Sequence, residues 1–237
     1  MIIALGNFLF RFRNVLFPLV MVLLILMPGV PFFADPLVAA LAGAVIAAAG
    51  QTVRAMTIGL QYIVRGGRHG RVYADDLVTG GVYNLCRNPM YVGNVLLVAG
   101  LALASNSLAT LLCALVLAIV AYAAIVAAEE HYLHGKFGAA YEAYCHDVPR
   151  WLPRLGALRG LLADSSFHWR RVIVKEYGTP FAWIGILCLI VIYQLWRTGA
   201  LEARWQIVQG LVALLIVAAG LWATARILKK TRRLVAD

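Results

Sequence analysis

A short motif at residues 85–93, "LCRNPMYVG", places a polar turn directly before a long apolar run. Asn88 is a favourable cap for a helix N-terminus, and Pro89 suits the first helical position, where its missing N–H costs nothing. A helix that begins here also presents unbonded backbone N–H groups and the positive end of its dipole. Gly93 lies one turn further along and has no side chain, so it leaves room for a bound group to approach the helix closely. The motif therefore predicts either a plain helix start or a site for an anionic group such as a carboxylate.

Two adjacent carboxylates, Glu129 and Glu130, end a later apolar run in the segment "AAEEHYL". Consecutive helical residues point about 100° apart, so at most one of the two can face a given site. Acidic residues at the margin of a membrane span are costly, and they tend to be paired or functional. We therefore expect one carboxylate to serve a site while the other faces water or lipid headgroups.

A third group of residues follows in "FGAAYEAYCHDVPRWLPRLG", residues 137–156. Its aromatic residues and its prolines suggest an amphipathic helix that lies on the membrane, aromatic side down, and ends at the prolines. Such an interfacial helix can also cover a ligand site as a lid.

Metal ligands are sparse in this chain. His131 and His134 stand three residues apart on one predicted helix face, but no further ligands accompany them convincingly. The four cysteines are widely scattered, and two lie inside apolar runs where they behave as small hydrophobic residues. The segment "GGRHG" at 66–70 has neither a P-loop lysine nor a preceding buried strand, so we interpret it as a flexible turn. We predict no bound metal.

The elements that must position these residues are membrane helices. Of the 237 residues, 62% are hydrophobic and only 14% are charged, which is too little polar surface for a soluble domain. The apolar residues form long unbroken runs, unlike the alternating segments of an outer-membrane barrel. We predict an all-α, polytopic transmembrane bundle of about six spans. The predicted helices are 14–33, 36–60, 89–104, 107–130, 178–197 and 205–227.

Breaks between the runs indicate how these helices connect. Pro28, Gly29 and Pro31 are expected to end the first helix. The polar turn "SNS" at 105–107 is short enough to force an antiparallel hairpin. Because no small-residue cleavage signal follows the first apolar run, we expect the first helix to be retained.

Basic residues are distributed unevenly along the chain, whose formal net charge is +10. If both termini are cytoplasmic, every lysine and arginine except Arg197 and Arg204 lies in a cytoplasmic segment, as the positive-inside rule requires. Topology and anionic lipid therefore explain the basicity, so we expect the partner to be the lipid bilayer and not nucleic acid. Two long cytoplasmic stretches, 61–88 and 131–177, mix aromatic with charged residues, and we expect them to fold onto the cytoplasmic face.

Taken together, these motifs resemble a known family. The chain carries G-V-Y, then R-N-P-M-Y-x-G, a hydrophobic hairpin, E-E, F-G-x-x-Y-x-x-Y and a V-P-R ending. Their order and spacing resemble the isoprenylcysteine carboxyl methyltransferase family and its relatives, the phospholipid N-methyltransferases, over roughly residues 40–155. The family's common form is R-H-P-x-Y-x-G, and Asn88 replaces the histidine here. Asparagine cannot titrate near neutral pH, so we expect no acid–base role at this position.

The resemblance implies an S-adenosylmethionine site at the cytoplasmic membrane surface. The site would belong to a methyltransferase-like core at residues 61–156, between N-terminal helices at 1–60 and a linker with a C-terminal helix pair at 157–237. Glu130 lies eight residues before Gly138, as the family's cofactor-binding glutamate does before its F-G glycine. The predicted cofactor-binding residues are Leu77, Val78, Tyr83, Asn88, Pro89, Met90, Tyr91, Gly93 and Glu130. The predicted catalytic residues are Arg87 and Glu129, and the predicted substrate contacts are Tyr141, Tyr144 and Arg150.

The chemistry of these residue types suits that cofactor. The helix N-terminus would bind the methionine carboxylate, and Glu130 would bind the ammonium or a ribose hydroxyl. The ring faces of tyrosine side chains would contact the sulfonium cation. The methyl acceptor is expected to be lipid-like: an isoprenylcysteine carboxylate needs no base, whereas a phospholipid amine must be presented unprotonated. We assign that role, or the orientation of the substrate, to Glu129.

Two other functions remain open at this stage. Sterol and steroid reductases have a similar membrane architecture and use NADPH, and the cations Arg65, Arg68 and Arg71 fit that larger anionic cofactor. A small transporter or membrane assembly protein would explain the helices but not the motif spacing. The C-terminal helix pair either shapes an entrance for an amphiphile or forms an oligomer contact.

Overall fold

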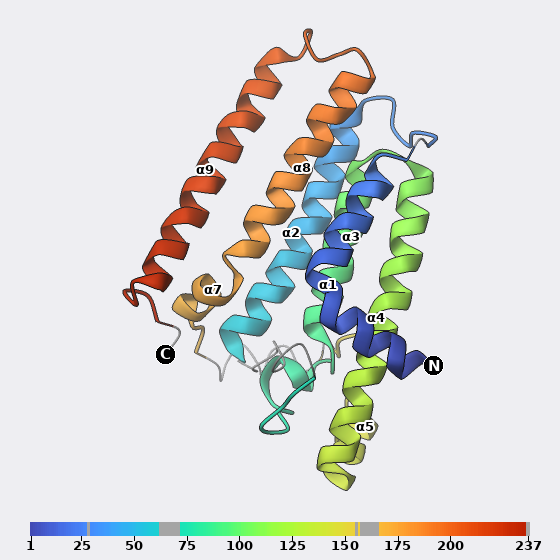
Figure 1. The fold of residues 1–237 in the computed structure, drawn as a ribbon, viewed down its shortest axis with the longest axis vertical. Helices are drawn as coiled ribbons and strands as arrows, with labels where there is room; N and C mark the ends of the chain where they lie inside the picture. The colour runs from blue at the N-terminus through green and yellow to red at the C-terminus, as the bar shows by residue number, and fades with distance from the viewer. Residues whose placement is uncertain (28, 62–71, 155, 157–165, 236–237) are drawn as a thin grey trace.

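The computed structural model describes residues 1–27, 29–61, 72–154, 156 and 166–235, and this part of the chain is helical and contains no strand. Figure 1 shows a bundle of long, roughly parallel and antiparallel helices. In chain order the elements are α1 (Ile2–Ile25), α2 (Pro36–Leu60), the 3-10 helix η1 (Gly81–Asn84), α3 (Pro89–Ala104), α4 (Leu108–Phe137), α5 (Ala139–Asp147), α7 (Trp169–Glu176), α8 (Gly178–Arg197) and α9 (Trp205–Lys230).

Five of these helices are long and apolar enough to cross a membrane: α1, α2, α4, α8 and α9. The apolar helix α3 is shorter, with 16 residues. These findings confirm the predicted helical membrane bundle, and the chain is an integral membrane protein. α1 begins and α9 ends at the same end of the bundle, the end that also carries α5 (Figure 1). That this end faces the cytoplasm remains a prediction from the distribution of charge.

The sequence predicted most helix boundaries but misplaced the first helix. α2, α3 and α8 match the predicted ranges, whereas α1 spans Ile2–Ile25 instead of 14–33. Arg13 lies inside α1, and its guanidinium is 4.2 Å from the centre of the Phe10 ring. A long basic side chain can extend from a membrane helix toward water, so it does not have to end the helix. α4 continues beyond the predicted end at residue 130 to Phe137, and α9 continues to Lys230.

α2 and α3 approach closely because glycines face each other along their contact. A methyl group on Gly93 would lie 2.8 Å from the carbonyl oxygen of Gly50 and 2.6 Å from Cγ of Arg54. Gly43 and Gly100 form a second such pair. Small residues at a membrane helix contact allow the two backbones to pack together without lipid between them.

A buried ion pair fastens the C-terminal helices to this α2–α3 unit. Arg54 on α2 donates to both carboxylate oxygens of Glu176 on α7, at 2.5 and 2.9 Å, and it also contacts Asn94 on α3. The side chain of Glu176 is only 4% exposed. Removing either member would leave a buried charge without its partner, which typically costs about 3–5 kcal/mol.

The opposite end of the bundle is closed by polar contacts. The SNS turn joins α3 to α4 as predicted, and Asn106 accepts hydrogen bonds from the backbone N–H groups of Phe32 and Phe33. Asp35 caps α2 by accepting a bond from the N–H of Leu37 and also pairs with Arg204 at 2.8 and 3.0 Å.

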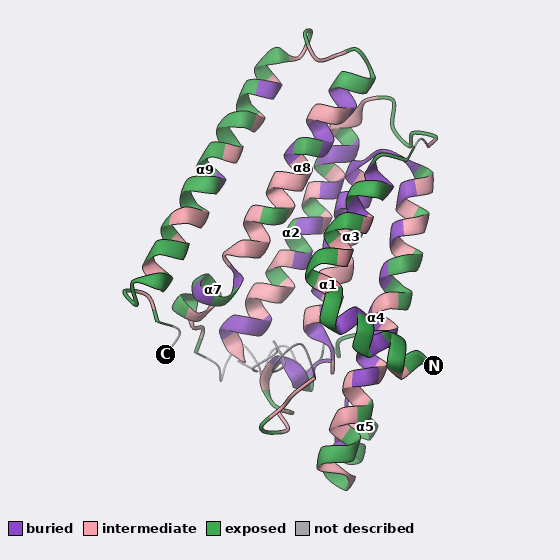
Figure 2. Ribbon diagram, viewed as in Figure 1, coloured by how far each residue is buried: buried purple, intermediate pink, exposed green. Residues whose placement is uncertain are grey.

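Figure 2 shows buried residues on the inward faces of the helices and exposed residues on the outward faces. α9 buries only Val208 and Ala218. Its exposed side chains include large apolar residues such as Ile216, Val217 and Leu221, which suit contact with lipid.

Candidate functional site

The two long connecting stretches pack against each other at the end of the bundle where α1 begins. The backbone N–H of Arg87 donates to the carbonyl of Pro149 at 2.9 Å, and that of Arg154 donates to Leu85 at 3.0 Å. The hydroxyl of Tyr144 reaches the carbonyl of Tyr83 at 2.7 Å. These contacts cross about 60 to 70 residues of sequence and hold α5 beside η1 and the start of α3.

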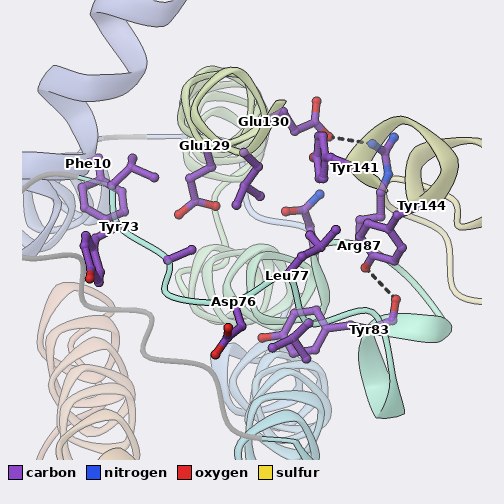
Figure 3. A pocket seen from close by; sticks show the side chains of 15 residues that line it. Phe10, Tyr73, Asp76, Leu77, Tyr83, Arg87, Glu129, Glu130, Tyr141 and Tyr144 are labelled. Carbon is purple, nitrogen blue, oxygen red and sulfur yellow. Dashed lines mark hydrogen bonds and ion pairs between the residues drawn. The ribbon is translucent and has the colours of Figure 1, made fainter. Parts of the chain in front are cut away.

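A cavity with apolar, aromatic and charged residues in its walls lies between these segments, and we call it the loop cavity (Figure 3). α1, the loop before η1, the start of α3, the end of α4 and α5 each contribute to it. Its enclosed volume is about 90 Å³. The lining residues are Phe10, Val72, Tyr73, Ala74, Asp76, Leu77, Val78, Tyr83, Arg87, Asn88, Glu129, Glu130, Leu133, Tyr141 and Tyr144.

Glu129 and Glu130 both line the cavity, so the expectation that only one of them faces a site was wrong. Two arginines hold Glu130 at the cavity wall. Arg150 approaches both of its carboxylate oxygens, at 3.1 and 2.7 Å, and Arg87 lies 3.2 Å from Oε1. The carboxylate side chain is 22% exposed. Arg150 thus serves as a partner of Glu130, although the sequence assigned it to the substrate.

Arg87 offers an additional donor to the cavity. Its Nη1 contacts Glu130 and also the thiol sulfur of Cys145. Its Nε is buried and has no hydrogen-bond partner among the described residues. A buried guanidinium N–H without a partner costs free energy, and an anionic oxygen placed in the cavity would relieve that cost.

Tyr141 and Tyr144 turn inward from α5 and line the loop cavity. They are 3% and 9% exposed and pack with Val148, Leu77 and Leu133. We expected the aromatic side of this segment to lie on the membrane, but the structure buries it within the protein. Burial, together with the Glu130 carboxylate, raises the pKa of the Tyr141 hydroxyl well above its usual range, so this hydroxyl stays protonated.

The start of α3 differs from the sequence interpretation. Asn88 occupies the cap position and lines the cavity, but its side chain makes no capping bond; Nδ2 donates instead to the carbonyl of Arg150. Pro89, Met90 and Gly93 do not line the cavity. Gly93 faces Gly50 on α2, so its small size serves helix packing and not cofactor approach. Donors for an anion therefore come from Arg87 more than from the helix N-terminus.

Tyr91 connects the loop cavity to a second space. Its hydroxyl donates to Oε1 of Glu129 at 2.7 Å. Glu129 lines the loop cavity, whereas Tyr91 lines a larger open groove of about 670 Å³, which we call the side groove. Residues of α1, α2, α3, α4, α7, α8 and α9 line the side groove.

The sequence did not identify several residues at the loop cavity. Phe10 comes from α1 and Leu133 from α4, while Tyr73 and Asp76 come from the loop before η1. Tyr73 and Asp76 lie in a stretch whose mix of aromatic and acidic residues could have drawn attention to them. Phe10 carries no comparable signal, because its position depends on how α1 packs against α4.

Two other sequence interpretations concern cations and metals. The arginines at 65, 68 and 71 and the "GGRHG" turn lie outside the described residues. Within the described ranges, no group of three or more histidine, cysteine, aspartate or glutamate residues is placed to hold a metal ion. His134 instead contacts Glu142 at 2.7 Å on the surface.

Comparison with known proteins finds a family match for part of the chain. Residues 38–140, which run from α2 to the start of α5, match the phospholipid methyltransferase family. The matched segment is 103 of the 237 residues, which is less than half of the chain. The match confirms the resemblance drawn from the motifs, and it includes Leu77, Arg87, Glu129 and Glu130. Tyr141, Tyr144, Arg150 and helices α7 to α9 lie outside the phospholipid methyltransferase segment.

Two curated relatives are known from heavy-metal resistance. The cobalt-zinc-cadmium resistance protein CzcN of Cupriavidus metallidurans is 34% identical over 131 residues, which cover 49% of this chain and 60% of that protein. The nickel-cobalt-cadmium resistance protein NccN of Alcaligenes xylosoxydans xylosoxydans is 36% identical over 85 residues, covering 35% of this chain and 39% of the relative. The chain thus spans less than two thirds of either relative. No solved structure gives a significant match.

Proposed function

We propose that this protein is an S-adenosylmethionine-dependent methyltransferase that binds its cofactor in the loop cavity and methylates an amphiphilic acceptor from the membrane. The observation that carries the proposal is the convergence of residues from a phospholipid methyltransferase segment on one cavity. Leu77, Val78, Tyr83, Asn88 and Glu130, all expected to bind the cofactor, line it together with both predicted catalytic residues, Arg87 and Glu129.

The polar groups of the cavity suit the cofactor's charges. Arg87 and its buried Nε would bind the methionine carboxylate, and the Glu130 carboxylate would accept bonds from the ammonium or a ribose hydroxyl. Tyr141 and Tyr144, outside the matched segment, would place aromatic surface near the sulfonium cation. In this proposal Arg87, and not the helix N-terminus of α3, is the main hydrogen-bond donor to the anionic carboxylate.

Binding would require the cavity to enlarge. Small-molecule sites usually measure about 300–1,000 Å³, whereas the loop cavity encloses about 90 Å³. The wall formed by Val72 to Val78 is a loop, and Lys136 at the end of α4 contacts its Ala74 and Asp75 carbonyls. Outward movement of this loop would admit the cofactor, and its closure would exclude water from the transfer.

Glu129 and Tyr91 would act on the acceptor at the boundary of the two spaces. Bound S-adenosylmethionine would supply a methyl group on a positively charged sulfur; as the methyl bonded to the acceptor, the carbon–sulfur bond would break and its electron pair would stay on sulfur. An amine acceptor must first lose a proton, which the Glu129 carboxylate would accept. A carboxylate acceptor would need no base, and Glu129 would then serve to orient it.

Calorimetry with detergent-purified protein tests the cofactor assignment. We expect heat of binding with S-adenosylmethionine and none with NADPH, and we expect Arg87→Met to abolish it. The matched control is Arg154→Met, because Arg154 bonds Asn84 at the surface and does not line the cavity. Binding of NADPH in place of S-adenosylmethionine would favour a reductase and reject the proposal.

A further inference from the structure

The described walls of the loop cavity carry more negative than positive charge. Three carboxylates line the cavity, on Asp76, Glu129 and Glu130, whereas Arg87 is the one cation among the described lining residues. Arg150 adds a second cation from outside the lining, because it lies 2.7 Å from a carboxylate oxygen of Glu130. With three negative and two positive formal charges, the described site has a net charge of −1.

The three carboxylates differ in what already binds them. Glu130 pairs with two arginines, and Glu129 accepts a hydrogen bond from the Tyr91 hydroxyl at 2.7 Å. Asp76 is exposed on the loop before η1 and has no hydrogen bond or ion pair with any described residue. Figure 3 shows its side chain across the cavity from Glu130. The uncompensated negative charge of the site therefore lies on Asp76.

The neighbouring charges on this loop do not cancel that excess. Lys136 contacts the backbone carbonyl of Asp75 at 3.3 Å. Neither residue lines the cavity, and their side chains carry opposite charges, so together they add no net charge beside it.

The charges of S-adenosylmethionine complement this distribution. The molecule carries an ammonium and a sulfonium cation but a single carboxylate anion, so its net charge is positive. Arg87 would bind the carboxylate, as the buried Nε without a partner suggests. Two guanidinium groups already compensate Glu130, so Asp76 is left to attract a cationic group of the cofactor.

We propose that Asp76 makes the loop cavity select the sulfonium cofactor over its thioether product. This proposal rests on the proposed function, because it takes the cofactor to bind in that cavity. In the proposed transfer the methyl carbon bonds to the acceptor, the carbon–sulfur bond breaks and its electron pair stays on sulfur. The product, S-adenosylhomocysteine, has a neutral sulfur and no net charge. The Asp76 carboxylate therefore attracts the cofactor more strongly than the product.

The place of Asp76 on a loop extends this role to product release. The loop from Val72 to Val78 is the cavity wall that must move outward to admit the cofactor. Attraction between Asp76 and a bound cation favours the closed loop, which excludes water from the transfer. Loss of the sulfonium charge removes that attraction, so the loop opens more readily once the methyl group has been transferred.

Calorimetry of the detergent-purified full chain with S-adenosylmethionine and with S-adenosylhomocysteine tests this role. Asp76→Asn keeps the size of the side chain and removes its charge. Because an exposed ion pair changes an affinity only modestly, we expect about three- to fivefold weaker binding of the cofactor and unchanged binding of the product. Asp76→Glu keeps the charge and should keep the wild-type preference. Asp147→Asn is the matched control, because Asp147 is 72% exposed and does not line the cavity.

Salt dependence separates the charge of Asp76 from its shape. Raising the ionic strength from about 0.01 M to about 1 M shortens the Debye length from about 30 Å to about 3 Å. The preference for the cofactor over the product should shrink in wild type and change less in Asp76→Asn. The same salt dependence in both proteins would contradict the proposal.

The outcomes for the two ligands distinguish this role from the proposed function. If Asp76→Asn binds both ligands as wild type does, or loses affinity for both equally, the role of Asp76 is rejected and the cofactor site stands. If wild type binds neither ligand, the proposed function and the role of Asp76 are both rejected.

Discussion

The hydroxyl of Tyr91 donates a 2.7 Å hydrogen bond to Glu129, and this contact joins the loop cavity to the side groove. Tyr91 is 4% exposed and packs against Tyr122, with ring centres 5.3 Å apart. The carboxylate is therefore held in a fixed direction at the boundary where cofactor and acceptor would meet. In the proposed mechanism Glu129 therefore serves the transfer, while Arg87 and Arg150 hold Glu130.

Glu129→Gln separates catalysis from cofactor binding. The substitution keeps the shape of the side chain and removes the proton acceptor, so methyl transfer to an amine lipid should fall by about 100-fold or more. Calorimetry should give an S-adenosylmethionine affinity close to that of wild type. A loss of cofactor affinity equal to the loss of activity would place Glu129 in cofactor binding instead.

Tyr91→Phe tests the positioning of that carboxylate. Loss of one hydrogen bond to a charged group is worth about 1.5–3 kcal/mol, so kcat should fall roughly 10- to 100-fold while the cofactor affinity stays unchanged. Raising the pH should partly restore the rate with an amine acceptor, because more of the amine is then unprotonated. A rate that is lowered equally at every pH would indicate a structural role for Tyr91.

Glu130→Gln should weaken cofactor binding and leave the fold intact. The substitution removes the charge that Arg87 and Arg150 share, and loss of a charge-assisted hydrogen bond predicts an affinity roughly 10- to 100-fold lower by calorimetry. Glu142→Gln is the matched control, because Glu142 is 62% exposed and does not line the cavity. An unchanged affinity in Glu130→Gln would remove Glu130 from the cofactor site.

Gly93→Ala should destabilise the contact between α2 and α3. The added methyl would meet Gly50 and Arg54 at 2.8 and 2.6 Å, and overpacking of this kind costs about 1–3 kcal/mol. A thermal shift assay should show a lower midpoint for this variant. Gly210→Ala is the control, because a methyl there meets no atom within 4 Å and alanine favours a helix. Equal midpoints for the two variants would contradict the close packing.

The sequence predicted helices well where local signals mark their ends. Pro36 and Pro89 stand at the first helical positions of α2 and α3, and both helices begin where expected. α1 was misplaced because Arg11 and Arg13 were treated as loop residues, although long basic side chains can extend from a helix toward the membrane surface. Charge alone therefore does not end a helix at the edge of a membrane.

Part of the candidate site was also predictable, because the motifs lie in the connecting segments that pack against each other around the loop cavity. Leu77, Tyr83, Glu129 and Glu130 line one cavity as a group. Gly93 could not be assigned correctly, since its role depends on which helix packs beside it. The same is true of Phe10 and of the Arg54–Glu176 pair, whose members lie 122 residues apart.

Methyl transfer itself tests the central claim most directly. Purified protein in vesicles of extracted lipids would be incubated with S-adenosylmethionine labelled in its methyl group, and the lipids would be extracted and counted. The account predicts label in the lipid fraction with wild type and roughly 100-fold less with Glu129→Gln. Wild-type protein that binds S-adenosylmethionine but transfers no label to any lipid would contradict it.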